Sequence, residues 1–143
     1  MRIKQKSLKV GQKFSTKDDA FAYVSGRKMS NRMMLTEATE KHNVLFLQRG
    51  KAYYTNKSKE KVEVGENRVF VDRIESSRTH AKPFRIDLNK PCLVFVKELK
   101  RGNAALAYYR FHGEFNVNCV KSLHTPNDYV EFVKIGDVVN VKA

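Results

Sequence analysis

The most informative segment of this chain is residues 92–117, with the sequence CLVFVKELKRGNAALAYYRFHGEFNV. β-branched and aromatic residues dominate its two halves, 92–99 and 107–117, which is typical of β-strands. The polar residues 100–103 between them include Gly102 and Asn103, and these residue types readily adopt the left-handed backbone of a tight turn. The segment therefore predicts a β-hairpin at the centre of the fold.

The second half of this segment alternates apolar and polar side chains with a period of two, as a strand with one buried face does. The apolar set predicts one face that packs into the core. The polar set predicts an opposite face shared by Tyr108, Arg110, His112 and Glu114.

Other segments predict further local structure. Thr16 to Val24 predicts a helix, because Thr16 is a good N-cap, Asp18 and Asp19 suit the first turn, and Gly26 suits the end. Residues 33–42 predict a second helix, with a strand as the alternative. Apolar or alternating runs predict strands at 43–47, 68–74, 84–88, 129–135 and 138–141. Residues 52–55 are expected to be a strand or the start of a loop, and residues 56–67 a long exposed loop, with a short strand at 62–64 as the alternative. Residues 119–126 are expected to form a connection.

The length of 143 residues fits one domain with a real core. Residues 1–14 are expected to be a basic arm or edge strand with a turn at Gly11, 15–42 a helical part, and 43–143 a β-rich part. The predicted class is α+β, with a strongly curved, mostly antiparallel sheet or half-open β-barrel and one or two N-terminal helices.

Charge is the clearest compositional signal. The chain has 28 Lys and Arg against 15 Asp and Glu, a net charge of +13. Residues 1–60 hold 14 basic and 5 acidic side chains, whereas residues 102–143 hold 4 of each. This uneven excess of positive charge favours a polyanionic partner, and a solvated basic surface is the alternative.

The same composition argues against other classes. No apolar run is long enough for a membrane span, and no secretory signal follows the N-terminal charges, so we expect a cytoplasmic protein without a membrane partner. Cys92 and Cys119 are then expected to be buried thiols, with a disulfide or a two-cysteine metal site as alternatives. The four histidines lack ligand spacing, and we expect no metal and no cofactor.

Two loops and several tyrosines are the candidate nucleic-acid contacts. The cations and hydroxyls suit phosphate, arginine also suits guanine, and the tyrosines suit stacking on an unpaired or flipped base. Solvated loops and sheet packing explain the same residue types. The candidates are Arg27, Lys28 and Arg32 in one loop, Arg73, Ser77, Arg78 and Lys82 in the other, and the tyrosines Tyr53, Tyr54 and Tyr108.

A catalytic alternative uses the polar strand face. His112, Glu114 and Arg110 together suit proton transfer to, and charge stabilisation of, a phosphate leaving group. They would make the chain a small metal-independent RNase-like enzyme or toxin. An outward polar strand face without catalysis accounts for the same pattern.

Residues 44–117 resemble a domain of unknown function found at the C-terminal end of bacterial restriction-type helicase and phospholipase-D-type nuclease proteins. The resemblance rests on short pieces spread over about half of the chain, which are Val44–Leu47, Lys57–Ser58, Val69–Phe70, Ser76–Ser77, Thr79, Leu93–Glu98 and Tyr109–Phe115. It implies a β-barrel-like DNA-recognition module of the kind used by restriction enzymes and modified-base readers, without catalytic residues.

Together these observations predict a small basic nucleic-acid-binding module that does not catalyse a reaction. DNA is favoured over RNA, in a restriction-modification, defence-system or mobile-element context. The alternatives are the RNase-like enzyme and a protein-interaction or inhibitor module that binds an acidic protein.

Overall fold

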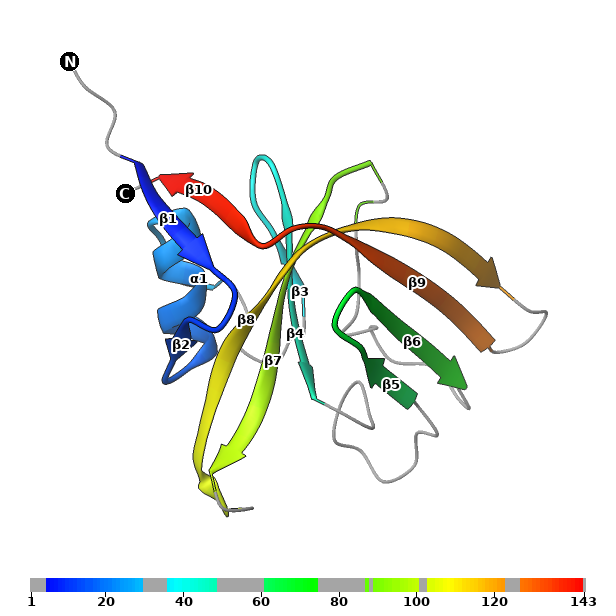
Figure 1. The fold of residues 1–143 in the computed structure, drawn as a ribbon, viewed down its shortest axis with the longest axis horizontal. Coiled ribbons are helices and arrows are strands. Elements are labelled where there is room, and N and C mark those ends of the chain that lie inside the picture. Colours follow the sequence, from blue (N-terminus) through cyan, green and yellow to red (C-terminus); the bar gives the residue numbers. More distant parts are fainter. Residues whose placement is uncertain are drawn as a thin grey trace.

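The computed structural model describes residues 5–29, 36–48, 61–74, 87, 89–100, 103–122 and 127–142 (Figure 1). These ranges form one helix and ten strands. In chain order they are β1 (Gln5–Lys9), β2 (Lys13–Phe14), α1 (Lys17–Ser25), β3 (Thr36–Ala38), β4 (Asn43–Gln48), β5 (Lys61–Val64), β6 (Arg68–Ile74), β7 (Cys92–Lys100), β8 (Asn103–Ser122), β9 (Asn127–Gly136) and β10 (Val138–Lys142).

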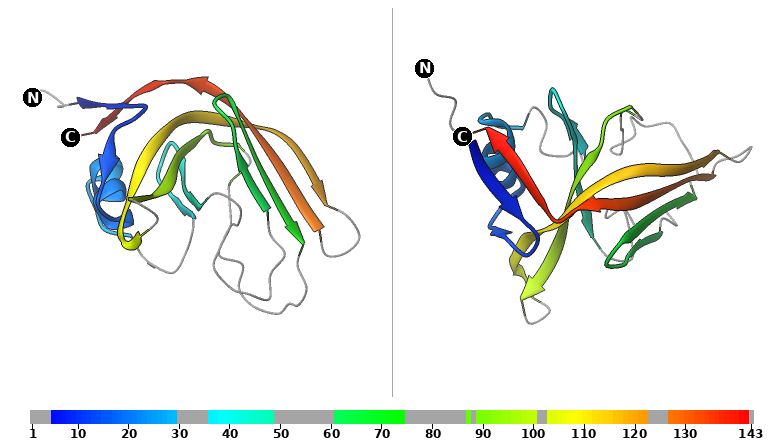
Figure 2. Two further views of the ribbon diagram at one scale, coloured as in Figure 1. Left: turned by 60° about the horizontal axis from the view of Figure 1, so that its bottom comes forward. Right: turned by 45° about the horizontal axis from the view of Figure 1, so that its top comes forward.

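Most strands form one mixed sheet in the order β3-β4-β7-β8-β9-β6-β5, and β2 also pairs with β8. β4 and β7 are parallel, whereas the other pairs are antiparallel. β1 and β10 form a separate antiparallel pair of strands. The predicted α+β class is confirmed. Figure 2 shows β8 and β9 bending along their length, and no pairing between described strands closes the sheet into a barrel. A half-open barrel stays a prediction.

Helix α1 has the ends that the sequence predicts. The Thr16 side chain accepts a hydrogen bond from the Asp19 backbone N–H at 3.0 Å, which satisfies one of the free donors at the helix start. Gly26 ends the helix with a φ of 79°, a left-handed conformation that favours glycine. Ala20, Phe21 and Val24 are the buried face.

The second predicted helix, 33–42, is wrong over its described part. Thr36–Ala38 is strand β3, which pairs with the start of β4. A turn follows, in which the Thr39 backbone N–H donates to the His42 carbonyl at 2.7 Å. Because β4 is a strongly apolar strand with a free edge, pairing with it outweighs the weak helical preference of this segment. Residues 33–35 lie outside the described residues.

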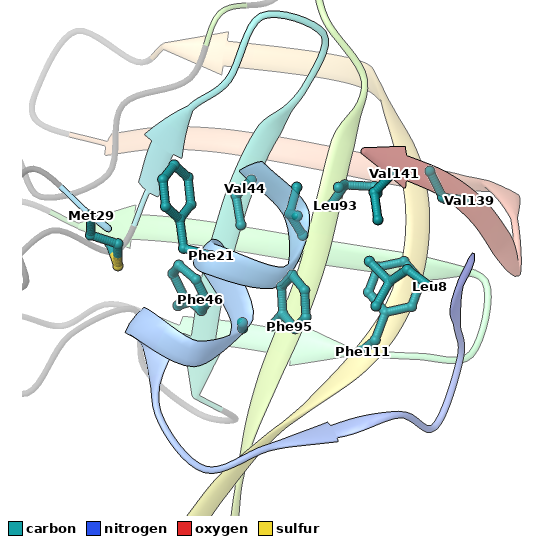
Figure 3. Packing of buried hydrophobic residues seen from close by; sticks show 12 residues of the cluster. Leu8, Phe21, Met29, Val44, Phe46, Leu93, Phe95, Phe111, Val139 and Val141 are labelled. Atoms are coloured by element: carbon teal, nitrogen blue, oxygen red, sulfur yellow. The ribbon is translucent and has the colours of Figure 1, made fainter. Parts of the chain in front are cut away.

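Two hydrophobic cores lie on opposite faces of β4 and β7. The helix core lies under α1 and the β1–β10 strand pair (Figure 3), and consists of Leu8, Ala20, Phe21, Val24, Met29, Val44, Phe46, Leu93, Phe95, Phe111, Val139 and Val141. The sheet core joins β4 and β7 to β6 and β9, and consists of Leu45, Leu47, Val69, Val71, Cys92, Val94, Val96, Phe115 and Phe132. Burial on both faces explains why β4 and β7 are continuous apolar runs.

The β7–β8 hairpin is confirmed, but its second strand does not keep one apolar face. Val94 lies opposite Gly113 and Phe95 lies opposite Phe111, so His112 is an extra residue in β8. Such a bulge reverses the side-chain alternation beyond it. Phe111 therefore packs in the helix core, whereas Phe115 packs in the sheet core.

Gly113 makes this bulge possible. Its φ is 135°, and a Cβ at this position would lie 2.8 Å from Cε of Lys134. A residue with a side chain would therefore be strained there and would also collide with β9.

The remaining strand predictions have mixed outcomes. Strands are confirmed near 68–74, 129–135 and 138–141, whereas the loop expected over 56–67 is wrong at Lys61–Val64, which form β5, the alternative considered there. The predicted connection 119–126 is wrong at its start, because β8 continues to Ser122 and pairs there with β9. Residues 52–55, 84–86 and 88 lie outside the described residues, and Asp87, the described residue of the strand predicted over 84–88, is in no strand. In the described ranges, no helix is long and apolar enough to cross a membrane.

Candidate nucleic-acid interface

Two cations and a tyrosine meet where β2 joins β8, and we call Lys13, Tyr108 and Arg110 the cationic cluster. Phe14 pairs with Tyr109 and packs in the helix core, where its ring lies 5.7 Å from that of Phe95. The preceding residue, Lys13, therefore lies on the other face of the sheet, directly opposite Arg110.

Tyr108 lies between the two cations. The Arg110 Nη2 atom donates a hydrogen bond to the Tyr108 hydroxyl at 3.1 Å, and the Arg110 Cζ atom lies 5.9 Å from the centre of the Tyr108 ring. The Lys13 Nζ atom lies 5.1 Å from the same centre. Both distances are within the range of cation–π attraction, so the ring holds two positive charges close together.

This arrangement is unfavourable without an anion. Like charges directly opposite each other on paired strands repel by about 0.2–1 kcal/mol. The Arg110 Nε–H is buried and has no hydrogen-bond partner, which costs about 1–3 kcal/mol. Among the residues that the structure describes, no ion pair joins Lys13 or Arg110 to a carboxylate.

One acidic residue lies near the cluster. Glu98 of β7 is opposite Tyr108 and is half-buried, so its carboxylate is on the same face and offsets part of the charge. With two cations against this one carboxylate, the cluster is suited to an anion that brings further hydrogen-bond acceptors, such as a phosphate.

In the first predicted basic loop, Arg27 makes contacts within the protein, whereas Lys28 is exposed to solvent. Arg27 donates to the Ala38 carbonyl at 3.0 Å and pairs with Glu37 at 3.4 Å, and its Cζ atom lies 4.9 Å from the centre of the Phe21 ring. These contacts tie the end of α1 to β3, so Arg27 has a structural role.

The other predicted contacts lie mainly outside the described residues, which leaves them untested. Arg73 has its backbone in β6, opposite Asp128, but its side chain is outside the described part. The same holds for the whole of Arg32, Tyr53, Tyr54, Ser77, Arg78 and Lys82.

The predicted face shared by His112 and Glu114 is wrong, because the bulge separates them. His112 stacks on Phe115, with ring centres 5.6 Å apart, and its Nε2 atom lies 2.6 Å from the Gly65 carbonyl oxygen. Glu114 lies opposite Leu93, on the helix-core side, and pairs with His42 at 2.9 Å. Only Tyr108 and Arg110 of the predicted catalytic face contact each other.

Lys13 is the member of the cationic cluster that sequence reasoning missed. Its pairing with Arg110 depends on contact between strands that lie far apart in the chain, and no local pattern reveals it. The described residues contain no group of three or more His, Cys, Asp or Glu that would hold a metal ion.

No protein-family model and no curated protein sequence matches the chain. The fold is similar to part of a solved structure, that of the 5-hydroxymethylcytosine-specific restriction enzyme AbaSI, with a TM-score of 0.62 and 11% sequence identity. The match covers 94% of this chain and 42% of that one, so this chain spans less than half the length of that enzyme. The chain therefore shares its fold with one part of a restriction enzyme.

Proposed function

We propose that this chain is a DNA-binding module of a restriction-type system, and that it recognises DNA without cutting it. The observation that supports this most strongly is the cationic cluster, in which Lys13 lies opposite Arg110, Glu98 offsets only part of their charge, and the Arg110 Nε–H has no hydrogen-bond partner. Phosphates of a nucleic-acid backbone supply such anions at regular spacing.

Two further observations favour DNA. The net charge of +13 supports binding to a polyanion. The fold is shared with part of an enzyme named for specificity toward 5-hydroxymethylcytosine, a modified base of DNA. DNA that carries this base is therefore the first ligand to test. Arg73 and Arg78, from the second predicted basic loop, are proposed as additional phosphate contacts.

The catalytic alternative has lost its geometric support. His112 and Glu114 lie on opposite faces of β8, so they do not form an acid–base pair on one phosphate. The protein-interaction alternative, with an acidic partner, gains no specific contact from the structure. We therefore carry DNA recognition forward.

The proposal is tested by titrating short fluorescent duplex DNA, single-stranded DNA and RNA with the protein and measuring fluorescence anisotropy. Unmodified and 5-hydroxymethylcytosine duplexes are compared at low salt, and each sample is then run on a denaturing gel. We expect duplex DNA to bind most tightly and to stay intact. If about six phosphates are contacted, raising the salt from about 50 to about 200 mM should weaken binding roughly a thousandfold.

Two results would oppose the proposal. Absence of binding to any nucleic acid at low salt would mean that the positive charge serves another purpose. Metal-independent cutting of RNA that disappears in His112→Ala would instead support the enzyme alternative.

A further inference from the structure

The β7–β8 hairpin extends beyond the strands on either side of it. β4 ends at Gln48, which lies opposite Lys97 of β7. On the other side, β2 reaches only as far as Lys13 and Phe14, opposite Arg110 and Tyr109 of β8.

Residues 98–100 and 103–108 therefore have no other strand beside them in the described part of the chain. Glu98 pairs with Tyr108 and Lys100 with Asn103, and the register shifts between these two pairs, where four residues of β8 lie across from Leu99 alone. We call these two segments the ribbon. Figure 1 shows the ribbon projecting from the sheet at the lower left of the view.

The chemistry of the ribbon fits a nucleic acid. Leu99 is 42% exposed, so its methyl groups are available for contact with a partner. Glu98 and Lys100 flank it in sequence, Lys97 precedes Glu98, and residues 103–113 of β8 contain no acidic residue. The ribbon itself thus presents an apolar contact group beside one cation and one carboxylate, and the excess of positive charge lies at its base, at Lys13 and Arg110.

The dimensions of the ribbon indicate which groove it fits. Three residues of β-strand beyond Lys97 extend about 10 Å, since each residue rises about 3.3 Å. The major groove of B-DNA is about 12 Å wide and about 8.5 Å deep and admits a two-stranded β-ribbon, whereas the minor groove is only about 6 Å wide.

The cationic cluster lies at the base of the ribbon. Arg110 and its partner Lys13 lie where β2 pairs with the hairpin, next to the pair formed by Phe14 and Tyr109. A ribbon inserted to its full depth would bring these two side chains to the rim of the groove, where the phosphates lie.

We propose that the ribbon enters the major groove of duplex DNA, with Leu99 against base edges and Lys13 and Arg110 on phosphates at the groove rim. This inference rests on the proposed DNA binding and adds the element and the groove. Apolar contact by Leu99 suits the methyl group of thymine or another group at the same edge of a pyrimidine.

The first test needs no mutation. Dimethyl sulphate methylates N7 of guanine, an atom in the major groove, and we would measure which guanines the bound protein protects in a mixed-sequence duplex. We expect a short block of protected guanine N7 atoms. Tight, salt-dependent binding that leaves every N7 atom reactive would overturn the ribbon proposal while preserving DNA binding.

The second test changes the ribbon surface. Leu99→Asp places a carboxylate where the bases are expected, and we expect duplex affinity to fall at least about tenfold with loss of the N7 protection. The control is Ile135→Asp, because Ile135 is also an exposed apolar strand residue, 52% exposed, in β9, which does not pair with the ribbon.

Melting temperatures of both variants establish that they are folded. Equal DNA affinity of the two variants would refute the role of the ribbon. If the parent protein binds no duplex at all, the proposed function fails as well, so the two failures are distinguishable.

Discussion

The substitution Lys13→Glu separates the binding role of the cationic cluster from its effect on stability. Lys13 lies directly opposite Arg110 across β2 and β8, so a glutamate there replaces repulsion with attraction. Relief of the like-charge pair contributes about 0.2–1 kcal/mol and an exposed ion pair adds about 0–1 kcal/mol, whereas loss of the cation–π contact between Lys13 and Tyr108 costs about 0.5–1 kcal/mol. We therefore expect a free energy of unfolding within about 1 kcal/mol of that of the parent, and a melting temperature within about 4 °C of it.

The same substitution should weaken DNA binding. It removes the phosphate contact of Lys13 and neutralises Arg110, which is equivalent to two lost contacts. Each contact contributes about 0.9 to the slope of log K against log salt concentration, which at about 0.1 M salt corresponds to a factor of about 8 in affinity. We therefore expect binding about 60-fold weaker than that of the parent, with a slope shallower by about 1.8.

The assay is a duplex titration at several salt concentrations beside thermal unfolding followed by circular dichroism. The matched control is Lys41→Glu, the same charge change at an exposed residue in the turn between β3 and β4. A Lys13→Glu protein that binds DNA as well as Lys41→Glu does would refute the phosphate role. A fall of more than about 4 °C in its melting temperature would refute the repulsion between Lys13 and Arg110.

Three further predictions concern the scaffold that holds the cluster. Gly113→Ala should lower the free energy of unfolding by about 1–3 kcal/mol in urea titration, because of its φ of 135° and because the new Cβ would lie 3.1 Å from the Gly136 carbonyl oxygen of β9; an unchanged midpoint would contradict the bulge. Asn43→Ala should cost at least about 2 kcal/mol in the same assay, because the Asn43 amide accepts from the Asp87 N–H at 2.8 Å and donates to the Asp87 carbonyl at 2.9 Å; parent-like stability would show that these bonds contribute little. Burial raises the pKa of the Cys92 thiol from 9.0 to about 12, so in a Cys119→Ser background iodoacetamide should label folded protein very slowly at pH 9, and fast labelling would show that the thiol is accessible. Because this pKa is raised, the stability that the thiol contributes is complete below pH 9.0 and is lost between pH 9.0 and about 12.

Local signals in the sequence predict much of the fold. The hairpin of β7 and β8 follows from two β-rich runs around a glycine-containing turn, and α1 follows from Thr16 and Gly26 as its caps. These predictions succeed because the responsible residues are neighbours in the chain.

Features that depend on distant contacts could not be predicted in this way. β3 is a strand because β4 offers it an edge, and Lys13 meets Arg110 because β2 pairs with β8. The bulge at His112 leaves the alternation of the sequence unchanged while reversing which core each side chain enters. Gly113 was its one visible sign, since a glycine inside a strand often marks a bulge.

The most direct test of DNA binding through the cationic cluster is a nuclear magnetic resonance titration of the isotope-labelled 16.5 kDa protein with duplex DNA at low salt. Backbone amide shifts locate the contact surface residue by residue. We expect the largest changes at Lys13, Leu99, Tyr108 and Arg110, and smaller ones along the central strands. If the amide resonances of these four residues do not shift on addition of DNA, or if no amide resonance shifts at all, the proposed interface is contradicted.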